Sequence, residues 1–178
     1  YPDYFGKDFV LNDLAHDGGL TAIRIEGPTN SVDQRANRLS KELGLLDQEL
    51  SILDSEQSNI FWNRTKNLEV FKSLKSNLLR IVLPMSETLQ VIQKLKNFEI
   101  KYFIDWGGSL IWASFDQLNT KILSEIKDIV KKHQGYITLI KVEEDLKASA
   151  DIFTIDPIKY KISEKIKRSF DPKRIFNP

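Results

Sequence analysis

Two hydrophobic periods follow one another along the second half of the chain, and their order predicts an antiparallel sheet. Four segments carry alternating or unbroken apolar side chains, which is typical of strands. These predicted strands are 78–83, 100–106, 109–115 and 136–142. With a helical pattern after the first and the third, the order is β-α-β-β-α-β, that of the ferredoxin-like unit. We therefore expect an α+β fold, a ferredoxin-like plait with helices on one face of the sheet.

Helical spacing accounts for the segments between these strands. The first helix is expected to be capped by Ser86 and the second by Asp116, because both side chains accept hydrogen bonds from first-turn amides. Gly135 suits the exit of the second helix. A last helix is expected from Asp156-Pro157 to Asp171-Pro172. Its apolar side chains recur at every fourth position: Ile158, Ile162, Ile166 and Phe170.

The first part of the chain shows weaker patterns, which we interpret as an incomplete second copy of the same unit. The expected elements are a strand at 20–26, a helix from the capping box of Ser31 and Gln34 to Gly44, a weak strand at 48–53 and a helix at 55–73. In terms of domains, we expect an irregular lead-in over 1–19, one α+β domain over 20–156, and a C-terminal helix and tail over 157–178.

Gly107-Gly108 predicts a tight hairpin, because tight turns between strands need positive φ. A two-residue turn fixes which side chains oppose each other. One face is apolar and is expected under the helices, with the pairs Trp106–Ser109, Ile104–Ile111, Tyr102–Ala113 and Ile100–Phe115. The other face holds the pairs Asp105–Leu110, Phe103–Trp112 and Lys101–Ser114, to which neighbouring strands are expected to add Arg80, and Arg24 if its register agrees.

This mixed face has two interpretations. Phe103 and Trp112 form a cross-strand pair, which by itself stabilises a sheet exposed to water. Alternatively, the face is covered by another domain or a ligand, since burying two aromatic side chains contributes several kcal/mol, about 25 cal/mol for each Å². Rings beside the charges of Arg80 and Asp105 favour the second interpretation.

Composition excludes several classes of protein. The 178 residues include no Cys and two His, which removes thiol catalysis, disulfide scaffolds and a His-rich metal site within the chain. The net charge of +1 argues against capture of nucleic acid by charge alone. Residues 1–60 hold 5 basic and 11 acidic side chains, and residues 121–178 hold 13 and 9. This asymmetry reflects either solvated helix faces or a basic surface for a phosphate or an acidic partner.

Motifs for nucleotide, metal or nucleophile chemistry are missing: there is no GxGxxG, P-loop, HExxH or GxSxG. His133 is expected at the surface or at a helix C-terminus rather than as a base. His16 is interpreted in the same structural way. The Lys-rich run 159–168 is expected on the wet side of the last helix. The start at Tyr1 and the stop at Asn177-Pro178 suggest a piece of a longer chain.

The ending FDPKRIFNP, residues 170–178, resembles the C-terminal FDPxxIxNPG signature of FAD-linked oxidases of the vanillyl-alcohol oxidase type. Further segments are similar to the FAD-binding subunits of bacterial glycolate oxidases within that family. They are LRIVLP at 79–84, YFIDWGG at 102–108 with LIW at 110–112, HQGYITL at 133–139 and FWNR at 61–64. The resemblance is spread over most of residues 20–178.

This resemblance implies the C-terminal cap region of a two-domain flavoprotein, with FAD held mainly by an N-terminal domain of the same polypeptide. The cap would present a sheet face to the flavin and to a small 2-hydroxy acid. The tail would return to the flavin through Asn177, with a weaker role for Arg174. Arg80 would hold the substrate carboxylate and Asp105 would orient it. The paired His residues that metal-dependent caps present are missing from this chain. The resemblance therefore also allows a subunit that only carries a second flavin.

The same resemblance sets the expected partners and location. It implies the other glycolate oxidase subunits as partners, no nucleic acid and no membrane insertion of its own. The location would be cytoplasmic, with membrane association only through the complex. By itself the piece is expected to be inactive. The alternative is a non-catalytic interaction module whose sheet face docks a partner subunit.

Overall fold

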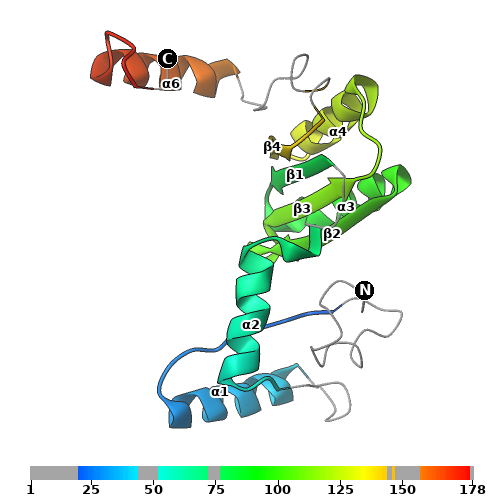
Figure 1. Cartoon of the computed structure of the whole chain (residues 1–178), viewed down its shortest axis with the longest axis vertical. Coiled ribbons are helices and arrows are strands. Elements are labelled where there is room, and N and C mark those ends of the chain that lie inside the picture. The colour runs from blue at the N-terminus through cyan, green and yellow to red at the C-terminus, as the bar shows by residue number, and fades with distance from the viewer. Residues whose placement is uncertain (1–19, 44–51, 72–76, 144–145, 147–156, 177–178) are drawn as a thin grey trace. The chain divides into compact units, whose positions relative to one another are not determined.

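The computed structural model describes residues 20–43, 52–71, 77–143, 146 and 157–176 (Figure 1). The chain divides into two units, Tyr1–Ser73 and Leu74–Pro178. Each unit is described by itself below. The expected lead-in at 1–19 lies outside the described residues, as does most of the expected weak strand at 48–53. The division into 1–19, 20–156 and 157–178 stays a prediction.

A four-stranded antiparallel sheet forms the centre of the second unit, with the strand order β2-β3-β1-β4. The strands are β1 (Asn77–Val82), β2 (Ile100–Asp105), β3 (Leu110–Phe115) and β4 (Tyr136–Lys141). The first and last strands in sequence are neighbours, and β3 lies between β1 and β2. This is the order of the ferredoxin-like βαββαβ unit, so the predicted fold class is confirmed.

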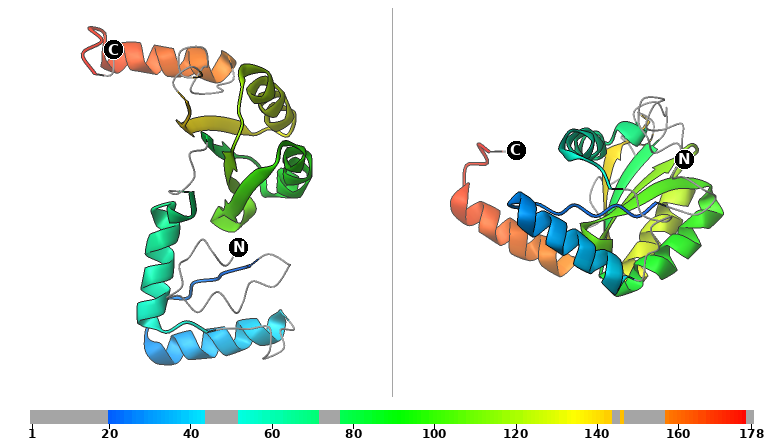
Figure 2. Two further views of the ribbon diagram at one scale, coloured as in Figure 1. Left: turned by 45° about the vertical axis from the view of Figure 1, so that its right-hand side comes forward. Right: turned by 90° about the horizontal axis from the view of Figure 1, so that it is seen from below.

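Two helices cover one face of this sheet, α3 (Thr88–Leu95) and α4 (Thr120–Lys132). Figure 2 shows both helices on the same side of the strands. Every second strand residue turns toward them, and the core joins these positions to the inner sides of the helices. Its fully buried members include Leu79, Ile81, Val91, Leu95, Ile111, Ala113, Phe115 and Ile126. The opposite face, which we call the second sheet face, carries Arg80, Phe103 and Trp112.

The hairpin between β2 and β3 has the predicted register. Ile104 opposes Ile111 and Phe103 opposes Trp112. Gly107 and Gly108 have φ values of 60° and 108°, the left-handed values that a tight hairpin turn requires. The hydroxyl of Thr88 in α3 donates to the carbonyl of Gly108 and so ties the turn to the helix layer.

The two inner helices begin later than the sequence indicated. Pro84 leads directly into a short 3₁₀ helix, Met85–Glu87, so Ser86 lies inside that turn and does not cap α3. At α4 the cap is Asn119, whose side chain accepts from the Ile122 amide at 2.9 Å. Asp116 lies too far before α4 to cap it. Between them, Leu118 is 7% exposed and packs into the core.

The chain leaves α4 through Gly135 as predicted. The need for glycine at this position comes from close packing and not from the ending of the helix. The left-handed residue there is Gln134, with φ 58°. At Gly135 a Cβ atom would lie 2.7 Å from Val130 Cγ1 and 2.9 Å from Leu83 Cβ. The close approach of helix and strand therefore requires glycine.

The described part of the first unit is helical, with α1 (Thr29–Glu42) and α2 (Ser55–Lys66). Residues 20–26 carry no strand, so the incomplete second copy is wrong for the described residues. The capping box of Ser31 and Gln34 is also wrong, because α1 begins earlier, after Pro28. The predicted helix 55–73 is broken at Leu68, whose φ is 54°. A real capping box lies at Asp54 and Gln57 of α2.

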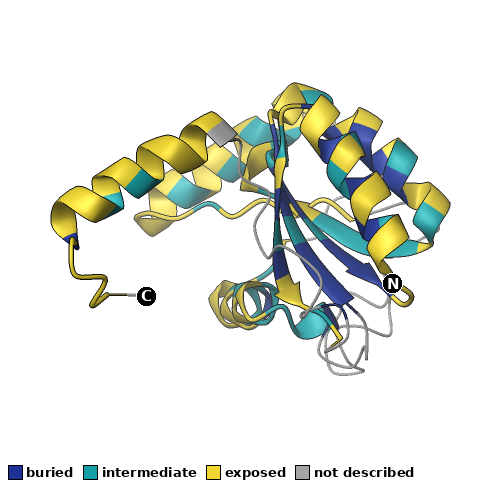
Figure 3. Ribbon diagram, turned by 90° about the horizontal axis from the view of Figure 1, so that it is seen from above, coloured by how far each residue is buried: buried dark blue, intermediate teal, exposed yellow. Residues whose placement is uncertain are grey.

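The C-terminal helix α6 (Pro157–Phe170) has the predicted start and end. Its apolar stripe is largely exposed, as the yellow ribbon in Figure 3 shows, and Phe170 is 85% exposed. After the helix, the carboxylate of Asp171 accepts from the amides of Ile175 and Phe176, both at 2.8 Å. These bonds hold the tail in a turn. Among the described residues, every helix is too short or too polar to cross a membrane.

Candidate functional site

Three of the predicted site residues lie in one row across the second sheet face. Phe103 on β2 opposes Trp112 on β3, and Trp112 opposes Arg80 on β1. Thr138 on β4 continues the row beside Arg80. Opposed residues in an antiparallel sheet bring their Cβ atoms within about 5.5 Å. The sheet therefore gathers two aromatic side chains, a guanidinium and a hydroxyl from four strands.

Arg80 has a further neighbour that the sequence analysis placed elsewhere. Its Cζ atom lies 4.9 Å from the centroid of the Trp106 ring, which is cation–π geometry. Trp106 was expected under the helices, and this expectation is wrong. The residue adopts φ 52° at the entrance of the turn, leaves the alternation of the strand and is 59% exposed.

In the described part of the chain, the Arg80 guanidinium has no carboxylate as a partner. The guanidinium contacts the ring of Trp106, and no ion pair of the described residues includes it. A half-buried guanidinium that forms no ion pair within the described residues is suited to an external anion, since its planar fork matches a carboxylate.

Asp105 is one row away from Arg80, opposite Leu110. One of its carboxylate oxygens accepts from the Trp106 amide at 2.7 Å. This bond supports the start of the turn and with it the place of the Trp106 ring. Asp105 thus acts on Arg80 through Trp106 in this structure, and the predicted direct orientation of Arg80 stays a prediction.

The second sheet face is not an ordinary wet surface. Leu110, Ser114 and Leu78, which share this face, are 1%, 2% and 7% exposed. Side chains on a solvated sheet face would keep much more of their surface. The chain's own residues bury these three side chains, so the interpretation of the face as covered by another domain or a ligand stays a prediction.

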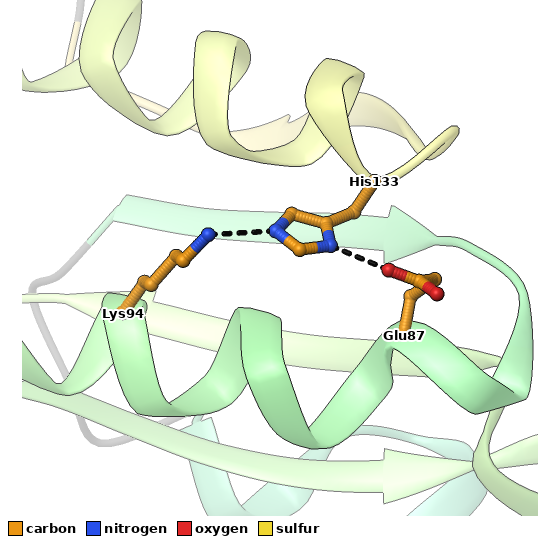
Figure 4. A network of polar contacts seen from close by, with 3 residues as sticks. All are labelled: Glu87, Lys94 and His133. Carbon is orange, nitrogen blue, oxygen red and sulfur yellow. Dashed lines mark hydrogen bonds and ion pairs between the residues drawn. The ribbon is translucent and has the colours of Figure 1, made fainter.

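A polar network on the helix side was not predicted (Figure 4). His133, the residue after α4, lies between Glu87 and Lys94 of the α3 segment. Its Nδ1 is 2.6 Å from Glu87 Oε2, and its Nε2 is 2.8 Å from Lys94 Nζ. An ammonium group only donates, so Nε2 accepts the hydrogen bond from Lys94. The ring proton is therefore on Nδ1, which donates a hydrogen bond to the Glu87 carboxylate.

His133 therefore connects the end of α4 to the α3 segment through both of its ring nitrogens. It is 7% exposed, so the expected surface location is wrong, whereas the expected position at a helix C-terminus is confirmed. Both ring nitrogens contact side chains of the α3 segment, Glu87 and Lys94. The signal was hidden because Glu87 and Lys94 are 46 and 39 residues away in sequence.

The remaining predicted site residues are not part of the row. Arg24 lies in the first unit, where it contacts Glu26 and, at 3.4 Å, the side-chain oxygen of Asn59. Arg174 is 3.8 Å from the Glu164 carboxylate of α6. Asn177 lies outside the described residues. Within the described ranges, no three His, Asp or Glu side chains gather as metal ligands.

Comparisons with known proteins add no relative. No family model matches the chain, and searches of curated proteins and of solved structures find no significant match. The fold and the arrangement on the second sheet face are therefore the basis for a functional proposal.

Proposed function

We propose that this chain is the cap region of an FAD-dependent 2-hydroxy-acid oxidoreductase, of the glycolate oxidase type. In this proposal an FAD-binding domain elsewhere in the same polypeptide holds the cofactor. The second sheet face of the cap covers the flavin and the substrate. The resemblance of residues 79–84, 102–112 and 170–178 to that family supports the class.

The observation that carries the proposal is the row of Phe103, Trp112 and Arg80 on the face away from α3 and α4. Flat aromatic side chains provide apolar surface for a ring system. Arg80 provides the cation for the carboxylate of a small acid. An FAD held by its own domain would supply the hydride-accepting chemistry at this face.

The residues of this chain would bind and orient rather than react. Arg80 would pair with the carboxylate through two parallel hydrogen bonds. Trp106 would restrict the guanidinium by lying 4.9 Å from it, and Asp105 would fix Trp106 through its amide. The aromatic row would exclude water from the reacting side, which strengthens the ionic contact. Asn177 and Arg174 of the tail would approach the flavin.

The test uses the full-length polypeptide that contains this chain, loaded with FAD. Flavin reduction is followed by absorbance after mixing with glycolate or lactate. Arg80→Ala is expected to lower kcat/KM about 10- to 100-fold, the loss of a charged hydrogen bond of about 1.5–3 kcal/mol. Arg80→Lys is expected to restore part of it. Arg24→Ala, a change of an arginine in the other unit, is the matched control.

Two results would overturn the proposal. The first is normal flavin reduction by Arg80→Ala and by Asn177→Ala. The second is stoichiometric FAD on this chain alone, because the cofactor is expected on the other domain. The proposal includes a cytoplasmic location, with membrane association only through partner subunits.

A second candidate function is a non-catalytic module that docks a partner subunit of an oxidoreductase complex through the same face. The cross-strand pair of Phe103 and Trp112 offers apolar contact surface on this face without requiring a substrate. Here Arg80→Ala and Trp112→Ala would leave flavin reduction unchanged and weaken assembly. Co-purification of the subunits and flavin reduction, measured on the same variants, separate the two functions.

A further inference from the structure

Strand β2 (Ile100–Asp105) is at the edge of the sheet, with β3 as its neighbour among the described strands. Its pairing with β3 runs without a register shift over all six residues. The strand contains no proline, the residue that natural edges often use to prevent further pairing. An edge of this kind offers a regular row of backbone donors and acceptors.

We propose that β2 pairs antiparallel with β2 of a second copy of this chain, about a two-fold axis at Phe103. Residues 101–105, Lys-Tyr-Phe-Ile-Asp, begin with a basic side chain and end with an acidic one. When two copies run antiparallel, the basic end of each therefore faces the acidic end of the other. Two copies aligned in this way join two four-stranded sheets into one. An isologous contact of this kind closes at the dimer.

Charge complementarity is the argument for this occupant. With Phe103 opposite Phe103, Lys101 of each copy lies opposite Asp105 of the other, on the second sheet face. The dimer therefore contains two opposite-charge pairs and no pair of like charges. One oxygen of Asp105 accepts from its own Trp106 amide, which holds the carboxylate in place at the strand end. Directly opposed charges of opposite sign stabilise antiparallel strands.

The side chains of β2 that point to the helix side are also complementary about this two-fold axis. Tyr102 of each copy lies opposite Ile104 of the other, and Ile104 is 40% exposed in the single chain. Trp106 follows the end of β2 and lies beside Arg80, so it is not part of this pairing. The pairing thus covers Ile104, the apolar side chain that the edge leaves in water. The other edge strand, β4, lacks this complementarity, because its one charged residue, Lys141, would oppose Tyr136.

The experiment measures the mass of the chain in solution by sedimentation equilibrium across a range of concentrations. The wild-type chain is expected to be a dimer at high concentration. Lys101→Glu makes the edge acidic at both positions, and Asp105→Lys makes it basic at both. Each variant alone is expected to raise the dimer dissociation constant about tenfold or more, since like charges then oppose each other twice.

Mixing the two variants gives the decisive measurement. A heterodimer of Lys101→Glu with Asp105→Lys restores both opposite-charge pairs, and so does the double variant with itself. Lys141→Glu on β4 is the matched charge reversal at the other edge and is expected to leave the dimer unchanged. Circular dichroism checks that each variant is folded.

A monomeric wild-type chain at all concentrations overturns the proposal. So does a dimer that survives both single reversals, or a mixture of folded variants that does not associate. None of these results depends on flavin or substrate, so this inference and the proposed function fail separately.

Discussion

The guanidinium carbon of Arg80 lies 4.9 Å from the centre of the Trp106 ring. Arg80 belongs to β1, whereas Trp106 is the first residue after β2. Trp106 reaches Arg80 because it leaves β2 with a positive φ at the first position of the turn. Any anion that Arg80 binds therefore meets a guanidinium already restricted on one side.

The first prediction concerns this contact. Trp106→Leu is expected to destabilise the second unit by about 0.5–1 kcal/mol, the usual strength of an exposed cation–π pair. Denaturant unfolding measures the change, and a double-mutant cycle with Arg80→Leu isolates the coupling. A coupling energy near zero would mean that the two side chains are neighbours without a mutual interaction.

The second prediction concerns His133. His133→Ala removes the partner of both Glu87 and Lys94 and is expected to cost about 1–3 kcal/mol of unfolding free energy. Lys132→Ala changes the preceding exposed residue and is expected to stay within about 0.5 kcal/mol. Equal losses in the two variants would show that the network contributes nothing specific.

The third prediction compares two glycines. Gly135→Ala is expected to destabilise by about 1–3 kcal/mol, because the new methyl group meets Val130, Leu83 and the Val82 carbonyl at 3.0 Å or less. Gly107→Asn has open space around it, and Asn accepts the positive φ of this turn position. It is expected to be nearly neutral in thermal unfolding. The reverse order of the two effects would contradict the close packing at Gly135.

The fourth prediction concerns the tail. Asp171→Ala removes the acceptor of the Ile175 and Phe176 amides, so both are expected to exchange hydrogen about tenfold faster or more. Ser169→Ala removes an exposed bond to the Lys165 carbonyl and is the control. Hydrogen-exchange mass spectrometry resolves the two segments. Unchanged protection at 175–176 would refute the carboxylate as the anchor.

Local patterns predicted the sheet correctly where neighbouring residues decide the structure. Gly107-Gly108 fixed the turn, and the alternation on either side then determined that Phe103 opposes Trp112. The helix starts predicted at Ser86 and Asp116 were wrong. Pro84 leads into a short 3₁₀ helix that includes Ser86, and Leu118 is buried in the core before α4 begins. The strand at 20–26 was wrong because alternation alone does not provide a partner strand.

By itself, the sequence determined the α+β class, the order of the second unit and the row of Phe103 and Trp112, since these follow from periods of two and from one turn. Tertiary structure decided the rest. Only the folded chain brings Arg80 to Trp106, and only the packing of α3 on α4 places His133 between Glu87 and Lys94. Those contacts join residues between 26 and 46 positions apart, and no local period reports which distant side chains meet.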